Sequence, residues 1–265
     1  MISAEKNMLL AQQVEAIARK AGKWMAGHKI SQVTTKGGVS NVVTDIDIQC
    51  QRLIIEECTR CLPESVILAE EENRQQIGEE FTWVIDPIDG TTNYLYDYRH
   101  SCVSIALYYQ KEGLIGVVYD PYLDECFVGI EGVGSTCNGQ TIRVSGNDFS
   151  HALMMVGTAP YNKEMADKTF AVLKRLFVET RDIRRSGSAA LDLCYLACGR
   201  IDGFFEPVLQ PWDYGAGSIL VRNAGGTLEA MTEGALAQLK PTGIIASNGT
   251  CHAALRSVIL EGETG

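Results

Sequence analysis

The segment WVIDPIDGTTN, which runs from Trp83 to Asn93, constrains this chain more than any other part of its sequence. Three apolar residues, typical of a buried strand, lead directly into Asp86, and Asp89 follows shortly after. Pro87 has a fixed φ and disfavours helical geometry for the residue before it, so the segment predicts a stiff turn at a strand end. Two carboxylates so close in the chain repel each other unless a cation lies between them.

The residues after the second aspartate are suited to binding a phosphate. Glycine lets the backbone approach a ligand closely, and the successive N–H groups of Gly90, Thr91 and Thr92 can form an anion site where a helix opens. Carboxylate oxygens are the ligands that Mg²⁺ prefers, and two such ions about 3.5–4 Å apart clamp both oxygens of a phosphoryl displacement. The simpler interpretation is a turn with capping aspartates, which an isolated Asp-Gly-Thr would favour.

Acidic residues elsewhere in the chain shift the balance toward a metal site. Glu70 follows an apolar run that predicts a neighbouring strand, and Asp213 stands at the start of a glycine-rich helix far along the chain. Asp45 and Asp47 follow a flexible Lys-Gly-Gly loop that begins at Lys36. Each of these acids alone is weak evidence, because an acid at a helix start is usually a cap. Together with the first segment, they favour metal-assisted phosphate chemistry.

The hydrophobic pattern predicts two helices beside an antiparallel sheet, followed by a second half in which strands and helices alternate. Helices are expected over 10–24, 45–58, 168–178, 189–198, 213–223 and 252–260. Strands are expected over 42–43, 66–69, 83–85, 102–109, 114–119, 125–130, 153–156, 203–205 and 244–246. The sequence therefore predicts one domain over 1–265, with sub-regions of about 1–150 (α+β) and 151–265 (α/β) that share a core.

Composition argues against several classes of protein. The net charge of −10 makes the chain a poor candidate for binding nucleic acid through its general surface. A hydrophobic content of 46% fits a large buried core. The first residues do not combine a basic segment with a long apolar run, and no stretch reaches about 18 uninterrupted apolar residues. We therefore expect neither a signal peptide nor a membrane span.

The nine cysteines are odd in number and scattered through apolar segments, a pattern typical of buried free thiols in a reducing cytoplasm. Cys58 and Cys61 form one C-x-x-C at the end of an expected helix. Without a second ligand pair nearby, this motif favours a structural role. The four histidines are scattered too, and we interpret them as ordinary surface or loop residues: His28, His100, His151 and His252.

The three acidic motifs, in this order, resemble the inositol monophosphatase family of magnesium-dependent, lithium-sensitive phosphatases. The family's first signature, W-x-I-D-P-I-D-G-T-x-N, is met in full from Trp83 to Asn93. Its second, W-D-x-[AG]-[AG]-G with an apolar helix and A-G-G, is met from Trp212 to Gly226, and its acid pair is met at Glu70-Glu71. The resemblance covers nearly the whole chain. It implies a layered α-β-α-β-α sugar-phosphatase fold, with an antiparallel N-terminal sheet and a mixed C-terminal α/β region, and a homodimer.

The resemblance also implies a role for each matching acid. Glu70, Asp86 and the Ile88 carbonyl would hold a first, catalytic Mg²⁺. Asp86, Asp89 and Asp213 would hold a second. Lys36, Thr44 and Asp47 resemble a mobile loop that helps to close over a third, weakly held ion.

The remaining matches concern water, phosphate and substrate. Glu70 and the Thr91 hydroxyl would orient the nucleophilic water, and the Gly90 and Thr91 amides would bind the phosphate. Glu206 matches an acid that hydrogen-bonds inositol or sugar hydroxyls, and Gly187-Ser188-Ala189 matches a pocket-lining segment. The residues expected to contact the substrate are Asp89, Gly187, Ser188, Ala189, Glu206 and Asp213.

This scheme suits a demanding reaction. Hydrolysis of phosphate monoesters requires up to ~10²¹-fold acceleration, because a dianion repels a water nucleophile. Metal charge offsets that repulsion and helps water to lose a proton, so no cysteine, serine or histidine nucleophile is required. Two departures from the family pattern, Thr158 after Gly157 and Gly215 within the second signature, remove no ligand but bear on pocket shape.

Several alternatives remain open at this point. A haloacid-dehalogenase-type phosphatase needs D-x-D-G-T, and Pro87 stands where its nucleophilic aspartate would be. A non-enzymatic alternative is a metal-binding scaffold or a partner of the RNA machinery. Within the family, fructose-1,6-bisphosphatase and 3′(2′),5′-bisphosphate nucleotidase compete with inositol monophosphatase. Glu206 favours a polyol ring, so we predict a phosphoric monoester hydrolase that acts on inositol 1-phosphate and on some sugar phosphates, without nucleic-acid or membrane partners.

Overall fold

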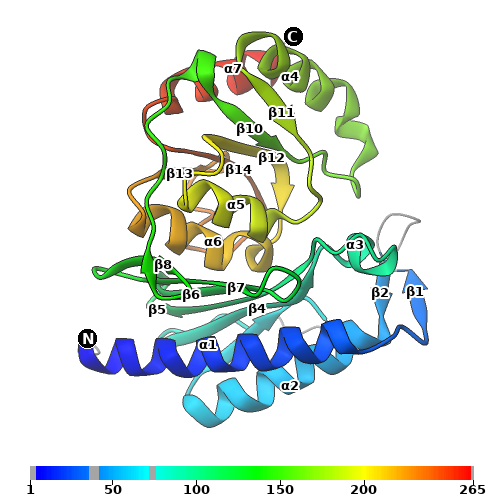
Figure 1. The fold of residues 1–265 in the computed structure, drawn as a ribbon, viewed down its shortest axis with the longest axis vertical. Coiled ribbons are helices and arrows are strands. Elements are labelled where there is room, and N and C mark those ends of the chain that lie inside the picture. The colour runs from blue at the N-terminus through cyan, green and yellow to red at the C-terminus, as the bar shows by residue number, and fades with distance from the viewer. Residues whose placement is uncertain (1–3, 36–41, 72–75, 264–265) are drawn as a thin grey trace.

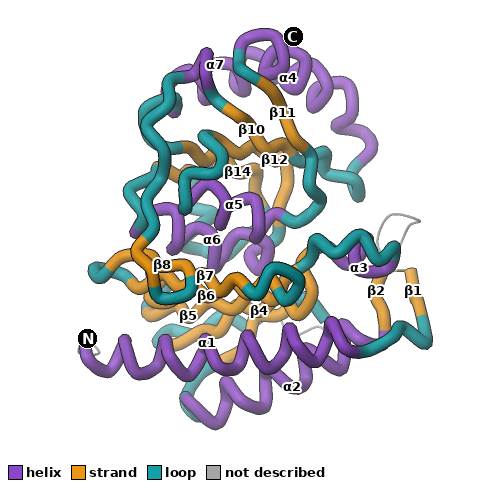
Figure 2. The backbone as a smooth tube through the Cα atoms, viewed as in Figure 1, coloured by secondary structure: helices purple, strands orange, loops and turns teal. Residues whose placement is uncertain are grey.

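Five layers of helices and sheets stack on one another in the computed structural model, which describes residues 4–35, 42–71 and 76–263 (Figure 1). Two helices lie on the outside, a sheet follows, two helices lie in the middle, then a second sheet and two more helices. The pairs are α1 (Ala4–Gly27) with α2 (Asp45–Cys61), α5 (Ala189–Ala197) with α6 (Pro211–Asn223), and α4 (Ala166–Glu179) with α7 (His252–Glu263). The expected α-β-α-β-α order is therefore confirmed, and Figure 2 shows the strands lying between the helical layers.

The first sheet has seven strands in chain order. They are β3 (Val66–Ala69), β4 (Phe81–Asp89), β5 (Cys102–Tyr109), β6 (Glu112–Asp120), β7 (Glu125–Ile130), β8 (Gly134–Cys137) and β9 (Gln140–Thr141). Neighbouring strands are antiparallel except for β3 and β4, which are parallel. The predicted antiparallel sheet is thus wrong at this edge. β4 therefore runs in the same direction as β3, and the two strands do not form a hairpin.

The second sheet has five strands in the order β11-β10-β12-β14-β13. They are β10 (Leu153–Val156), β11 (Asp182–Arg184), β12 (Gly203–Leu209), β13 (Thr227–Ala230) and β14 (Thr242–Ser247). β10 pairs in parallel with β11 and β12, whereas β14 pairs antiparallel with β12 and β13, which confirms the mixed C-terminal sheet. The remaining elements are a hairpin of β1 (Val33–Thr35) and β2 (Val42–Thr44), helix α3 (Thr91–Leu95), and 3-10 turns over Phe149–His151 and Lys163–Met165.

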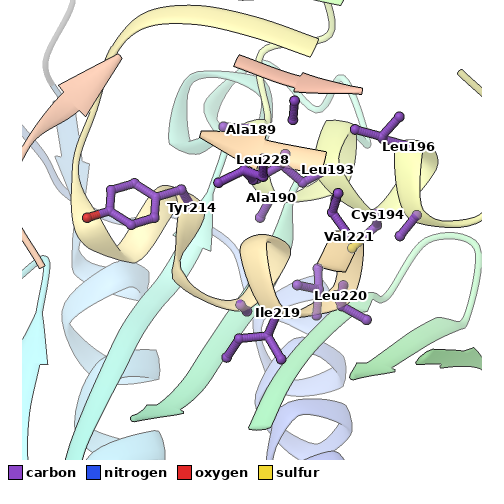
Figure 3. Close-up of a cluster of buried hydrophobic side chains, with 14 of the residues drawn as sticks. Ala189, Ala190, Leu193, Cys194, Leu196, Tyr214, Ile219, Leu220, Val221 and Leu228 are labelled. Carbon is purple, nitrogen blue, oxygen red and sulfur yellow. The ribbon is translucent and has the colours of Figure 1, made fainter. Parts of the chain in front are cut away.

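The central helices join the two halves of the chain through one hydrophobic cluster (Figure 3). Leu193 of α5 and Leu220 of α6 are buried in it with Val84 of the first sheet and Phe204 of the second. Gly116 of β6 allows this close approach, because a Cβ there would come within 2.5 Å of the Ala216 carbonyl oxygen of α6. The helix that carries Asp213 is thereby pressed against the sheet that carries Asp86 and Asp89.

Two composition-based predictions can be compared with this structure. All nine cysteines are free; Cys61, Cys137 and Cys198 are half-buried and the others are buried. Over the described ranges, no helix is both long and apolar enough to cross a lipid bilayer. The histidine prediction holds only in part: His28 and His151 are exposed, whereas His100 is half-buried with an Nε2 that no described group contacts by a hydrogen bond.

Candidate active site

The two aspartates of the first motif come together through an irregularity in β4. The sequence predicts that the strand ends before Asp86, but it continues to Asp89, and its pairing with β5 shifts register between these two residues. In a regular strand, residues three apart point to opposite faces of the sheet. The extra residue of a bulge reverses that alternation, and proline is tolerated at bulges because it has no N–H to donate. Pro87 therefore lies in a bulge within the strand and not in a turn after it.

A third carboxylate reaches the same place from the opposite side. Asp213 lies in the first turn of α6, where Pro211 begins the helix and Asp213 accepts a hydrogen bond from the Gln210 N–H at 2.7 Å. Each of Asp86, Asp89 and Asp213 offers a carboxylate oxygen, and these oxygens lie within 4.8 Å of one another. We call these three residues the carboxylate cluster. The convergence that the sequence predicts is therefore present in the fold.

Burial and neighbouring acids raise the pKa of the carboxyl groups in the cluster. Burial raises the pKa of Asp86 well above its ordinary value, and the neighbouring Glu70 and Asp89 raise it further. The pKa of Asp213 is raised in the same way, by burial and then by Asp89 and Glu70. Glu70 lines the same cavity, although its oxygens are outside the 4.8 Å group. Buried like charges of this kind are costly unless a metal ion compensates them.

The donor set fits a hard divalent cation. It consists of carboxylate oxygens, joined by the Ile88 carbonyl on the cavity wall, with no described sulfur or imidazole ligand in the group. Mg²⁺ and Ca²⁺ bind such oxygens, and Mg²⁺ commonly uses one or two protein carboxylates with substrate phosphate and water. The residues present therefore fit the predicted magnesium site.

The segment that follows β11 completes one side of the cluster. Ser188 donates a hydrogen bond from its hydroxyl to Asp89 Oδ2, and the Ala190 N–H donates to the same oxygen at 2.8 Å. Ser188 also caps α5, because its Oγ accepts from the Leu191 N–H. These bonds lower the pKa of Asp89, although burial outweighs them and leaves it raised. Ser188 and Ala190 thus orient a predicted metal ligand, while Gly187 and Ala189 line the cavity as expected.

The loop after β4 depends on glycine. Gly90 has φ of +88°, and a Cβ there would come within 3.0 Å of the His100 carbonyl oxygen and 3.3 Å of the Gly187 carbonyl oxygen. Both the conformation and the crowding exclude larger residues. The loop leads into α3, whose first residue is Thr91, and both Gly90 and Thr91 line the cavity.

Asp47 and Thr44 differ from their predicted place on a mobile loop. Thr44 is the N-cap of α2 and forms a reciprocal capping box with Asp47, and both side chains are buried. The Thr91 hydroxyl donates to Asp47 Oδ1 or to the Ile88 carbonyl oxygen, each at 3.1 Å. The capping box holds Asp47 in place, and Asp47 in turn accepts the hydrogen bond that positions the Thr91 hydroxyl. Lys36, the third predicted loop residue, lies outside the described residues.

Glu206 lies on β12 at the other end of the cavity lining. Its carboxylate accepts from the Ala159 N–H at 3.1 Å, and burial raises its pKa to about 7. Gly157 makes room for it, because a Cβ at that position would overlap the carboxylate at 2.0 Å. The cavity that joins Glu206 to the carboxylate cluster has a volume of about 740 Å³.

Sequence reasoning missed two charged residues that line the same cavity. Asp192 is 2% exposed on α5, and its Oδ1 has no hydrogen-bond partner among the described residues. It is the one acid in the otherwise apolar run AALDLCYLA, and a single acid in such a run could have indicated a functional residue. Arg185 precedes the Gly187 turn and gave no signal of its own. We call Arg185, Asp192 and Glu206 the Glu206 group.

Comparison with known proteins agrees with this geometry. The family model described as inositol monophosphatase family matches residues 5–261. Inositol-1-monophosphatase of Synechocystis sp. is 39% identical over 233 residues, which cover 87% of this chain and 81% of that protein. Nus factor SuhB of Escherichia coli (strain K12) is 38% identical over 222 residues, covering 82% of this chain and 83% of that protein.

Solved structures give the same relationship. The inositol monophosphatase from Anabaena (Nostoc) sp. superimposes with a TM-score of 0.84 and 35% identity, covering 96% of each chain. The similarity thus extends over the carboxylate cluster, the Gly90 loop and both sheets. The chain belongs to the inositol monophosphatase family.

Proposed function

We propose that the protein is a magnesium-dependent phosphomonoesterase that hydrolyses inositol 1-phosphate and related sugar phosphates. The observation that supports this proposal most is the convergence of Asp86, Asp89 and Asp213 from two distant segments. Burial raises the pKa of each, and Asp89 and Glu70 raise that of Asp86 and Asp213 further, which is unfavourable without a bound cation. Family membership supports a phosphatase, and the choice of inositol 1-phosphate rests on Glu206.

Two ions are proposed. Glu70, Asp86 and the Ile88 carbonyl would hold one, and Asp86, Asp89 and Asp213 the other. When bound, Mg²⁺ supplies positive charge that offsets the phosphate dianion and makes water a better nucleophile. The oxygens of Asp47 already accept hydrogen bonds from Thr44 and Thr91, so no third ion is proposed there.

The protein's own groups would orient the reactants. Thr91 keeps its hydroxyl between Asp47 and the Ile88 carbonyl, so its oxygen is fixed beside the first ion's ligands and can accept from water. Glu70 would accept a proton from that water. The Gly90 and Thr91 amides would bind phosphate oxygens, and Glu206 would accept from a hydroxyl of the leaving alcohol. Such fixed groups lower a barrier because they need no reorganisation during the reaction.

A substrate panel tests the proposal. Purified protein would be assayed with and without Mg²⁺ on inositol 1-phosphate, fructose 1,6-bisphosphate, 3′,5′-adenosine bisphosphate and p-nitrophenyl phosphate. We expect Mg²⁺-dependent phosphate release that is fastest with inositol 1-phosphate. Turnover of adenosine bisphosphate alone would contradict the substrate assignment, and trapping of an aspartyl-phosphate would favour the haloacid-dehalogenase mechanism despite Pro87. Asp167→Asn, an exposed change on α4, is a matched control for loss of one carboxylate.

A second candidate role comes from the relatives named Nus factor SuhB. Their name supports the alternative of a partner of the RNA machinery, which is compatible with the same fold. The retained carboxylate cluster favours catalysis, and the net charge of −10 does not favour direct contact with nucleic acid. Copurification with RNA polymerase that persists in an Asp86→Asn variant would separate this role from hydrolysis.

Location and assembly are also proposals. Nine free thiols suit a reducing compartment, so we propose that the protein works in the cytoplasm. The family resemblance supports a homodimer. Light scattering of the purified protein would measure its mass directly.

A further inference from the structure

Arg185 is the one cation among the described residues that line the active-site cavity. It follows β11 and precedes the Ser188 cap of α5. Its guanidinium folds back over the next turn, because Nη1 lies 2.5 Å from the place where a Cβ of Gly187 would be. Gly187 has φ of +91°, so the turn and the space above it both require glycine.

The backbone beneath this guanidinium is held firmly. Asn93 Nδ2 donates to the His100 carbonyl oxygen at 2.8 Å and to the Ser186 carbonyl oxygen at 3.0 Å. These bonds tie the Arg185–Gly187 segment to the helix that follows the Gly90 loop. The start of the arginine side chain is thus fixed relative to the phosphate side of the cavity.

Arg185 makes no hydrogen bond and no ion pair with any residue in the part of the chain that the structure describes. Burial raises the pKa of both Glu206 and Asp192, and the charge of Arg185 partly offsets that rise. Asp192 is 2% exposed, and its Oδ1 has no hydrogen-bond partner among the described residues.

A donor that no described residue pairs with, in the same cavity lining as a buried acceptor, complements a particular ligand. Arginine donates through a planar fork of N–H groups and cannot accept, whereas a carboxylate only accepts. A hydroxyl group both donates and accepts. Adjacent hydroxyls on a ring can therefore donate to Glu206 and accept from Arg185 at the same time. A second anionic group is less suitable, because the two neighbouring acids outnumber the one cation.

We propose that Arg185 is a specificity-determining residue that donates hydrogen bonds to hydroxyl oxygens of the leaving alcohol. Asp192, whose buried Oδ1 has no hydrogen-bond partner among the described residues and which lines the same cavity, is a positioning residue for the guanidinium. This inference rests on the proposed phosphatase function and names the feature of the substrate that the Glu206 group recognises, a pair of neighbouring hydroxyls.

The test compares an ester that has these hydroxyls with one that has none. Steady-state kinetics of Arg185→Gln should show a KM for inositol 1-phosphate that is raised about 10- to 100-fold, the loss typical of a hydrogen bond from a charged group. Its kcat/KM for p-nitrophenyl phosphate should stay within about 2- to 3-fold of the parent. Arg184→Gln, which changes the adjacent arginine outside the cavity lining, should leave both values unchanged. Arg185→Lys keeps the charge without the fork and should recover only part of the affinity.

Asp192→Asn tests the positioning role. It should raise the same KM in the parent but have no further effect in Arg185→Gln, because its influence passes through the arginine. Fully additive losses would overturn the role of Asp192. Equal losses on both esters in Arg185→Gln, or a changed mass in solution that accompanies them, would overturn the role of Arg185.

If the proposed phosphatase function is wrong, the assays give a different result from the one expected if only the role of Arg185 is wrong. A protein without Mg²⁺-dependent activity on p-nitrophenyl phosphate fails as a phosphatase. If the protein hydrolyses another polyol phosphate but not inositol 1-phosphate, that polyol phosphate replaces inositol 1-phosphate as the hydroxylated ester in the comparison. In that case Arg185→Gln must still separate the hydroxylated ester from p-nitrophenyl phosphate.

Discussion

The carboxylate cluster and the Glu206 group line one cavity but differ in how their charges are balanced. In the cluster, Asp86, Asp89 and Asp213 converge; burial raises the pKa of each, and Asp89 raises that of Asp86 and Asp213 further. In the Glu206 group, burial also raises the pKa of both acids, but Arg185 supplies a protein cation that partly offsets the rise. The difference indicates that the carboxylate cluster needs a metal ion, whereas the Glu206 group can bind a neutral, hydroxylated ligand without one.

The largest expected effect follows from removing one cluster charge. Asp86→Asn should reduce kcat/KM by roughly 10³-fold or more, about 4 kcal/mol, on every phosphate ester, because the metal charge serves the phosphate and not the alcohol. Glu206→Gln should instead raise the KM for inositol 1-phosphate and spare p-nitrophenyl phosphate. Kinetics on both esters distinguish the two patterns. If both variants lost activity in parallel, the proposed division of the cavity would be wrong.

The Thr91 hydroxyl should contribute the next largest effect. Thr91→Val keeps the shape of the side chain but removes the group that donates to Asp47 or the Ile88 carbonyl. We expect kcat to fall about 10²-fold, as when one catalytic hydrogen-bonding group is lost. Thr91→Ser keeps the hydroxyl and should retain most of the activity. A valine variant as active as the serine variant would rule out a role for this hydroxyl.

The raised pKa of Glu206 should make the free energy of unfolding of the metal-free protein depend on pH. The pKa of about 7 in the folded protein exceeds the ordinary 4.5, so the folded state holds this proton more tightly than the unfolded state. The resulting stabilisation is complete below about pH 4.5 and is lost as pH rises through about 7, a change of roughly 3 kcal/mol.

Urea unfolding in EDTA at pH 5 and pH 7.5 measures this loss. The free energy of unfolding should fall less over that interval in Glu206→Gln than in the parent protein. Glu79→Gln, an exposed change, should keep the parental dependence on pH. Identical pH dependence in the parent and in Glu206→Gln would show that this carboxyl group is not perturbed.

The smallest expected effect concerns the Gly90 loop. Gly90→Ala should lower the free energy of unfolding by about 1–3 kcal/mol, because of its φ of +88° and the nearby carbonyl oxygens of His100 and Gly187. Gly225→Ala is the matched control, since Gly225 has φ of +90° with nothing within 4 Å of its Cβ position. The excess cost at Gly90 therefore measures crowding in the loop. Equal costs at the two positions would mean that the loop can relax around the new methyl group.

Much of the carboxylate cluster was predictable because its ligands are close together in the sequence or lie at recognisable helix starts. The pair Asp86 and Asp89 stands in one short motif, and Asp213 opens a glycine-rich helix. The bulge between the first two was not predictable, because Pro87 fits a turn as well as a bulged strand. It is the pairing with β5 that decides between them.

The supporting residues were harder to predict because their roles depend on contacts across the fold. Asp47 reads as a helix cap in sequence, and only the packing of α2 against β4 brings it to Thr91. Asp192 is close to its cavity partners only after α5 lies between the two sheets. The layered fold was predictable from periodicity and resemblance, but the short strands β11 and β13 have too few residues to show a clear alternation.

Magnesium binding to the metal-free protein tests the central claim most directly. Isothermal titration at pH 7 in two buffers with different ionisation enthalpies gives both the affinity and the number of protons exchanged. Because the pKa of Asp86 and Asp213 is raised, we predict that Mg²⁺ binds and displaces protons, and that Asp86→Asn weakens binding and reduces proton release. No binding, or binding without proton release, would contradict the account.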